Sequence, residues 1–109
     1  MCIEREQNMR KWKKVNGVRL TYQYELNGLR AYNFKRFGKY TAPFISCGDR
    51  HKDRQEYDEW LWEEHGLTRK AVGDVVLHHQ IDGTMMLVPK EIHRVRHIGF
   101  IGVMKHLNP

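Results

Sequence analysis

The segment covering residues 74–100 constrains the fold of this chain more than any other, because strand, turn and helix signals follow one another in it without interruption. It reads DVVLHHQIDGTMMLVPKEIHRVRHIGF. The β-prone residues 75–77 and the short apolar run 85–88 flank the dipeptide Asp82-Gly83, which is typical of a tight turn. These residues predict a β-hairpin.

A short helix is expected directly after this hairpin. Pro89 suits the first turn of a helix, where its missing N–H costs nothing, and Gly99 suits the exit. We therefore expect residues 90–98 to be helical. His93 and His97 are four positions apart and would share one face of this helix. Two imidazoles in that arrangement can bind one metal ion.

The histidine pair at the end of the first predicted strand supplies the remaining parts of a catalytic site. His78 or His79 is placed to be the third ligand, and three protein ligands leave coordination positions open for phosphate and water. The other member of the pair would then suit the role of general base, since the unperturbed pKa of imidazole is about 6.5. Adjacent residues of a regular strand point to opposite faces, so the pair must sit at a strand end or a bulge.

The first third of the chain predicts another hairpin. Residues 15–37 contain two stretches rich in β-branched and aromatic side chains, joined by Asn27-Gly28, the dipeptide favoured in type I′ hairpin turns. The preceding residues 1–14 are expected to form a charged arm or a short helix.

A central amphipathic helix is predicted next. Asp49 is a good N-cap, the helix would run to about His65, and Gly66 would end it. Its buried face would carry Tyr57, Trp60 and Leu61. The acidic residues of this helix are expected to form its solvated face rather than a magnesium site. They are Asp53, Glu56, Asp58, Glu59, Glu63 and Glu64.

Length indicates one domain over residues 1–109. The predicted elements place it in the α+β class, with an N-terminal β-hairpin, a central amphipathic helix and a C-terminal module of two strands and a helix. No apolar run approaches the roughly 18 residues that a membrane span needs. Cys2 and Cys47 are too few for a disulfide framework, and they form no CxxC pair.

The charge of the chain favours a polyanionic partner. The net charge is +6, and residues 1–45 hold ten Lys and Arg side chains against three Asp and Glu. Basic side chains that neutralise phosphates release counterions, which drives association with nucleic acids. A solvated basic face would have the same composition, so charge alone leaves both interpretations open.

The histidine segment resembles a known family. LHHQIDGTMMLVPKEIHRVRHIG, residues 77–99, is similar to the core of the HNH/endonuclease VII superfamily. The likeness is specifically to nuclease toxins with an LHH or WHH signature, an LVP stretch and a terminal H…HxGG. Colicin-type DNases also share a His-His pair on the first strand of their ββα-metal motif and an HxxxH helix. Two departures are that His97 is followed by Ile98-Gly99-Phe100, and that Val76 replaces the acidic residue of the colicin-type DNases.

The resemblance implies a role for each of the four histidines. His78, His93 and His97 would bind one divalent ion, whether zinc, magnesium, manganese or nickel, and His79 would be the general base. Three basic side chains of the same segment border this site and would hold backbone phosphates of the substrate. They are Lys90, Arg94 and Arg96.

The resemblance further implies a metal-dependent endonuclease that hydrolyses DNA with low sequence specificity. Such a domain would act in the cytoplasm of the producing or target cell, either as part of a larger secreted toxin with a cognate immunity protein or as a freestanding phage or repair nuclease. The alternatives are an RNase of the same fold and a non-catalytic nucleic-acid-binding module with a structural zinc site.

Overall fold

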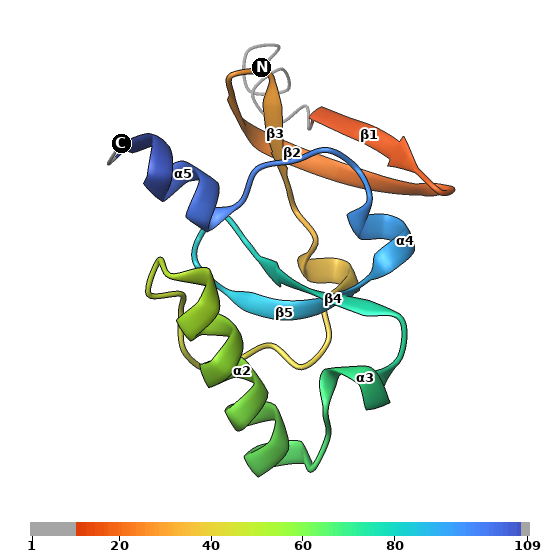
Figure 1. Cartoon of the computed structure of the whole chain (residues 1–109). Coiled ribbons are helices and arrows are strands. Elements are labelled where there is room, and N and C mark those ends of the chain that lie inside the picture. The colour runs from red at the N-terminus through yellow and green to blue at the C-terminus, as the bar shows by residue number, and fades with distance from the viewer. Residues whose placement is uncertain (1–10, 108–109) are drawn as a thin grey trace, which may run out of the picture.

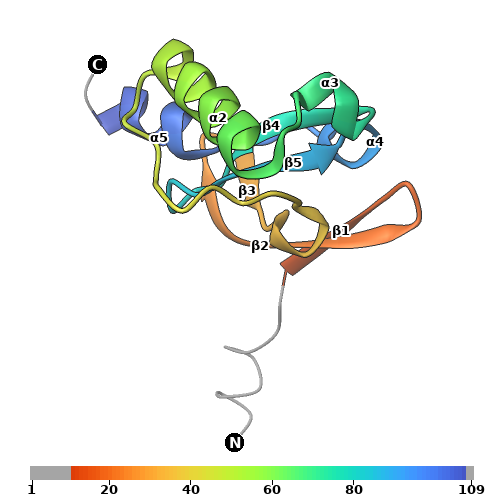
Figure 2. The same ribbon diagram turned by 90° about the horizontal axis from the view of Figure 1, so that it is seen from below.

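A two-stranded sheet lies between a three-stranded sheet and a long helix, which gives the molecule three layers (Figures 1 and 2). The computed structural model describes residues 11–107. Helices and strands are mixed along the chain, as the predicted α+β class requires. Two short elements join the larger ones: the 3-10 helix η1 (Lys35–Phe37) and the helix α3 (Arg69–Val72). No helix in the described residues has the length and apolar character needed to cross a bilayer.

The three-stranded sheet is an antiparallel meander of β1 (Lys11–Val15), β2 (Val18–Leu26) and β3 (Leu29–Tyr32). The predicted turn at Asn27-Gly28 connects β2 to β3, and both of its residues have positive φ, 51° and 79°. Positive φ at both central positions is the mark of a type I′ turn, for which asparagine and glycine are the preferred residues. The N-terminal hairpin is therefore confirmed, and it carries one more strand than predicted.

The additional strand changes the interpretation of the predicted arm or short helix. Residues 11–14 belong to β1, so that part of the prediction is wrong, and residues 1–10 lie outside the described residues. The reason is a second Asn-Gly turn at Asn16-Gly17, with φ of 47° and 82°. It folds the chain back so that Val15 pairs with Val18.

The central helix α2 (Arg50–His65) has the predicted ends. The carboxylate of Asp49 accepts hydrogen bonds from the backbone N–H groups of residues 51 and 52, and Gly66 ends the helix in the left-handed conformation at φ 62°. Tyr57 and Leu61 are fully buried, as predicted, and Trp60 is half-buried.

The hairpin of β4 (Val75–His79) and β5 (Met85–Pro89) is also confirmed. Its strand β5 is buried on both faces. Met86 and Val88 pack against the three-stranded sheet, whereas Met85 and Leu87 pack against Tyr57 and Leu61 of α2. Alternate side chains of this one strand therefore belong to two separate hydrophobic clusters, and the side chains of its partner β4 alternate in the same way.

The predicted helix over residues 90–98 is wrong beyond its first turn. Helix α4 (Lys90–His93) ends four residues before His97, and the next helix, α5 (Phe100–Leu107), begins only after Gly99. Tertiary contacts oppose a longer α4. The backbone N–H of Ile98 donates to the carbonyl of Arg30 in β3 at 3.1 Å, and Val95 packs against the cluster of the three-stranded sheet. A helix of two or three turns has little intrinsic stability to set against such contacts.

Candidate metal centre

Three of the predicted histidines meet around the ring of Phe34, a fully buried residue that follows β3. His78 comes from β4, His93 from the end of α4, and His97 from the irregular segment before α5. The centroids of their rings lie 4.5, 5.5 and 5.0 Å from that of Phe34. Although the shared helix face was wrong, the predicted trio is therefore brought together by a different backbone path.

The three imidazoles are close enough to hold one metal ion. One ring nitrogen from each of His78, His93 and His97 lies within 4.8 Å of the others. The shortest approach joins Nδ1 of His78 and Nε2 of His93 at 3.1 Å. Three nitrogen ligands without a fourth protein ligand are typical of catalytic zinc sites, and imidazole also suits nickel and manganese. The donor set therefore fits a divalent transition metal.

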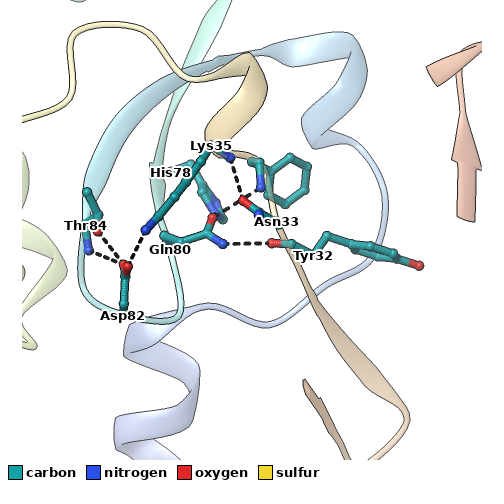
Figure 3. Close-up of polar contacts among 8 residues, drawn as sticks. Tyr32, Asn33, Lys35, His78, Gln80, Asp82 and Thr84 are labelled. Atoms are coloured by element: carbon teal, nitrogen blue, oxygen red, sulfur yellow. Dashed lines mark hydrogen bonds and ion pairs between the residues drawn. The ribbon is translucent and has the colours of Figure 1, made fainter. Parts of the chain in front are cut away.

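Outer hydrogen bonds orient two of these rings. Nε2 of His78 lies 2.9 Å from Oε1 of the buried Gln80, whose own Nε2 donates to the carbonyl of Tyr32 (Figure 3). His78 therefore donates through Nε2 and presents the Nδ1 lone pair to the cluster. Nδ1 of His97 donates to the carbonyl of Val95 at 2.6 Å, which leaves Nε2 for a metal. Such outer partners commonly fix the tautomer and orientation of metal ligands.

Burial keeps two of the three imidazoles, those of His78 and His93, uncharged. Burial first, and then the neighbouring histidines, lower the pKa of His78 from 6.5 to about 3, against the opposing effect of its hydrogen bond with Gln80. Burial and the proximity of His97 lower the pKa of His93 to about 4. Neutral imidazole is the form that binds metals, so both rings are ready to act as ligands at neutral pH.

His79 points away from this cluster, toward α2. The register of the hairpin explains the division, because His78 pairs with Met86 and His79 with Met85, and these methionines face opposite hydrophobic clusters. His79 is the last residue of β4, so the predicted position at a strand end is confirmed. Its Nε2 lies 3.1 Å from Oδ2 of Asp53, and its side chain is 11% exposed.

Asp53 is the residue of this site whose predicted position is wrong. It was expected on the solvated face of α2, yet its side chain is 0% exposed. Burial by itself would raise the pKa of Asp53, but hydrogen bonds from Ser46 and Cys47 and the nearby His79 outweigh it and place the pKa below its ordinary value. The available signal was position: Asp53 lies four residues before Tyr57, on the face that Tyr57 buries.

The four histidines of residues 74–100 line one cavity of about 600 Å³. Its basic lining residues are Arg50 and Arg54 of α2 and Arg69 of α3. Arg69 makes a two-pronged ion pair with Asp58, at 2.6 and 3.0 Å. Arg50 and Arg54 are exposed. Burial is the main cause that lowers the pKa of His79. Asp53 opposes this effect, and the positive charges of Arg50 and Arg54 add to it.

The basic residues predicted to bind substrate lie elsewhere. Lys90, Arg94 and Arg96 are exposed, and none of them lines the cavity. The pattern that suggested them was proximity in sequence to the histidines. Because α4 is only one turn long, that proximity does not place their side chains in the cavity. Their role in substrate binding stays a prediction.

Gly99 brings the backbone that follows the cluster against β4. A Cβ atom at this position would overlap the backbone carbonyl oxygen of His79. The chain can therefore pass here only with glycine, which explains physically why a glycine follows the histidine segment.

Comparisons of the chain with protein families, with curated proteins and with solved structures found no significant match. Function must therefore be inferred from the residues and geometry of this site.

Proposed function

We propose that this chain is a metal-dependent endonuclease that hydrolyses phosphodiester bonds in DNA, and that residues 74–100 act as a ββα-metal module of the HNH kind. The observation that carries the proposal is the content of one cavity. Three imidazoles close enough to hold a metal, a separate fourth histidine and arginine side chains all line it. These are the parts that phosphodiester hydrolysis needs: a metal site, a base and positive charge for phosphate.

His78, His93 and His97 would hold the divalent ion. When bound, such an ion supplies positive charge that polarises the phosphate and stabilises the leaving oxygen. The two arginines of α2 in the cavity wall, Arg50 and Arg54, would hold the negatively charged backbone on either side of the bond that breaks.

His79 is the general base in this proposal. Its Nε2 is engaged by Asp53, so Nδ1 is the ring nitrogen available to accept a proton. As the oxygen of water bonds to phosphorus, its proton passes to Nδ1 of His79, and the phosphorus–oxygen bond to the leaving strand breaks. Because burial lowers the pKa of His79, the ring is neutral and able to accept that proton at neutral pH.

The cellular role rests on the resemblance of LHHQIDGTMMLVPKEIHRVRHIG to nuclease toxins. We propose delivery to a target cytoplasm as part of a larger secreted protein, with a cognate immunity protein as partner. The neighbouring reading frame tests this role, because its product should bind this chain and block cleavage.

Cleavage of supercoiled plasmid DNA tests the activity. Protein stripped of metal should be inactive and should regain cleavage with zinc, nickel, manganese or magnesium. His93→Ala and His97→Ala should each lower metal affinity by orders of magnitude, measured by calorimetric titration, and abolish cleavage. The matched controls are His51→Ala, His65→Ala and His106→Ala, since these histidines are exposed and lie outside the cavity.

Two outcomes would contradict the proposal. Full metal affinity without His97 would refute the metal site as described. Tight zinc binding with no cleavage of DNA by any of the four metals would instead favour an RNase, if RNA is cut, or a non-catalytic module with a structural zinc.

A further inference from the structure

Asp53 is the only buried carboxylate among the residues that the structure describes, and its surroundings do not resemble those of an ordinary helix-surface aspartate. It lies in the first turn of α2 with its side chain turned inward, between the strand that carries His79 and the loop that precedes the helix. A carboxylate removed from water is strongly destabilising unless hydrogen bonds replace its hydration. Each of its oxygens must therefore be accounted for.

Both oxygens of Asp53 are engaged. Oδ1 accepts a hydrogen bond from the backbone N–H of Cys47 at 2.9 Å, and Oδ2 accepts one from the hydroxyl of Ser46. The backbone N–H of Gly48 donates to the Ser46 hydroxyl oxygen, so the single proton of that hydroxyl is directed to Asp53. The backbone of Ser46 is itself anchored, since its N–H donates to the carbonyl of Gly83 at 2.8 Å.

The remaining contact of Asp53 is with His79. An ionised carboxylate can only accept, so the 3.1 Å contact requires Nε2 of His79 to carry the proton. Neutral imidazole has one proton on its two ring nitrogens, and Nδ1 of His79 must then hold a lone pair. The loop and helix that fix Asp53 therefore also fix which nitrogen of His79 can accept a proton.

We propose that Asp53 is the positioning residue of His79: it holds the ring in one orientation and in the tautomer protonated at Nε2. This inference rests on the proposed function, in which His79 is the base, and it extends the site to α2, outside residues 74–100. The opposite directions of His78 and His79 give the reason. Because His79 faces away from the metal ligands, it needs an anchor of its own.

The alternative is that Asp53 only ties the loop to the start of α2. Asp53→Asn separates the two roles. The carboxamide of asparagine should place its oxygen toward the backbone N–H of Cys47, because the opposite orientation would set two donors, its NH₂ and that N–H, against each other. In the favoured orientation the NH₂ donates to Nε2 of His79, and the proton of the imidazole moves to Nδ1. The contact with the backbone of Cys47 is thus kept while the tautomer is reversed, and the hydrogen bond from Ser46 is lost, a loss for which Ser46→Ala is the control.

The decisive measurement is the tautomer of His79 in the zinc-loaded full chain, read from long-range ¹H–¹⁵N correlations of the imidazole. We expect Nε2 to carry the proton in the wild type and Nδ1 to carry it in Asp53→Asn. A wild-type His79 protonated at Nδ1 would overturn the inference, even if the variant failed to fold.

Kinetics on a labelled DNA duplex provide the second test. Asp53→Asn should lower kcat by roughly 10² to 10⁴, the usual contribution of a general base, with KM and zinc affinity unchanged. In a chain that already carries His79→Ala, adding Asp53→Asn should reduce the rate no further, because the two residues act as a unit. The matched control is Ser46→Ala, which removes a hydrogen bond from the same oxygen without touching His79, and its kcat should stay within a few fold of wild type.

The outcomes distinguish this inference from the function on which it rests. Wild type that cleaves no DNA with zinc, nickel, manganese or magnesium refutes the proposed nuclease. An active wild type in which Asp53→Asn leaves the tautomer and kcat unchanged refutes the positioning role alone. A loss of kcat in Asp53→Asn that is matched by Ser46→Ala also refutes it, because loop support would then explain the effect.

Discussion

Replacing Arg50 and Arg54 with glutamine tests which basic residues would hold the DNA backbone in the proposed nuclease. Both arginines line the cavity of the four histidines and are exposed to solvent. Arg69, the third arginine of the lining, is already paired with Asp58. Glutamine keeps most of the side-chain stem and removes the charge, so the double variant isolates the electrostatic contribution of the pair.

The expected magnitude follows from counterion release. Each phosphate contact contributes about 0.9 to the slope of log affinity against log salt concentration, so the loss of two contacts should reduce the slope by about 1.8. Between about 50 and about 200 mM salt, the affinity of the unsubstituted protein should then fall roughly tenfold more than that of the variant. At low salt the variant should bind DNA distinctly more weakly.

Fluorescence anisotropy with a labelled DNA duplex measures both quantities. All proteins in this experiment carry His79→Ala, so that the duplex is not cut during the titration. The matched control is Arg94→Gln with Arg96→Gln, which removes the same two charges from positions outside the cavity. An unchanged slope for the Arg50 and Arg54 pair, together with a reduced slope for the control, would refute the reasoning from the cavity and support the expectation from sequence.

Two further predictions concern stability. In the metal-free protein the pKa of His78 is about 3 and that of His93 is about 4, whereas a solvated histidine has a pKa of 6.5. Below about pH 6.5 these histidines bind protons in the unfolded chain but not in the folded one, so lowering the pH favours unfolding. The free energy of unfolding should therefore fall by about 1.4 kcal/mol per pH unit for each histidine as the pH drops toward 4. Urea unfolding at about pH 7 and pH 5 measures this, and equal stability at both values would contradict it. Gly99→Ala should destabilise the chain by about 1–3 kcal/mol in thermal melts, because its Cβ would overlap the His79 carbonyl. A melting temperature equal to wild type would show that the backbone has room there.

Elements whose signals are local could be predicted from the sequence. The ends of α2 were predicted because Asp49 and Gly66 act through their own neighbouring backbone groups. The turn at Asn27-Gly28 was predicted because positive φ at two successive residues strongly favours that dipeptide. In each case the residues that identify the cap or turn in the sequence are the same residues that form it in the structure.

Features that depend on distant contacts could not be predicted in the same way. Helix α4 ends at His93 because the segment after it is bound to β3 through Ile98 and Arg30, which the helix pattern does not reveal. Asp53 has the composition of a solvated helix position, and only the packing of α2 against β4 shows that its partner is His79. The approach of one member of the His78–His79 pair to His93 and His97 was nevertheless predicted, because it needs the segment only to fold back on itself, and the choice of His78 came from the family resemblance.

The loop between β4 and β5 sets the register in which these two strands pair. Within it, the carboxylate of Asp82 accepts hydrogen bonds from the backbone and hydroxyl of Thr84 and pairs with Lys35 at 2.6 Å (Figure 3). A shift of one residue in the pairing of two strands turns every side chain to the opposite face. If β4 moved by one position, His79 would join the imidazole cluster and His78 would face α2. The length and internal bonding of this loop thus determine which histidine meets the other two imidazoles and which meets Asp53, so two chemically identical side chains acquire different surroundings through alignment alone.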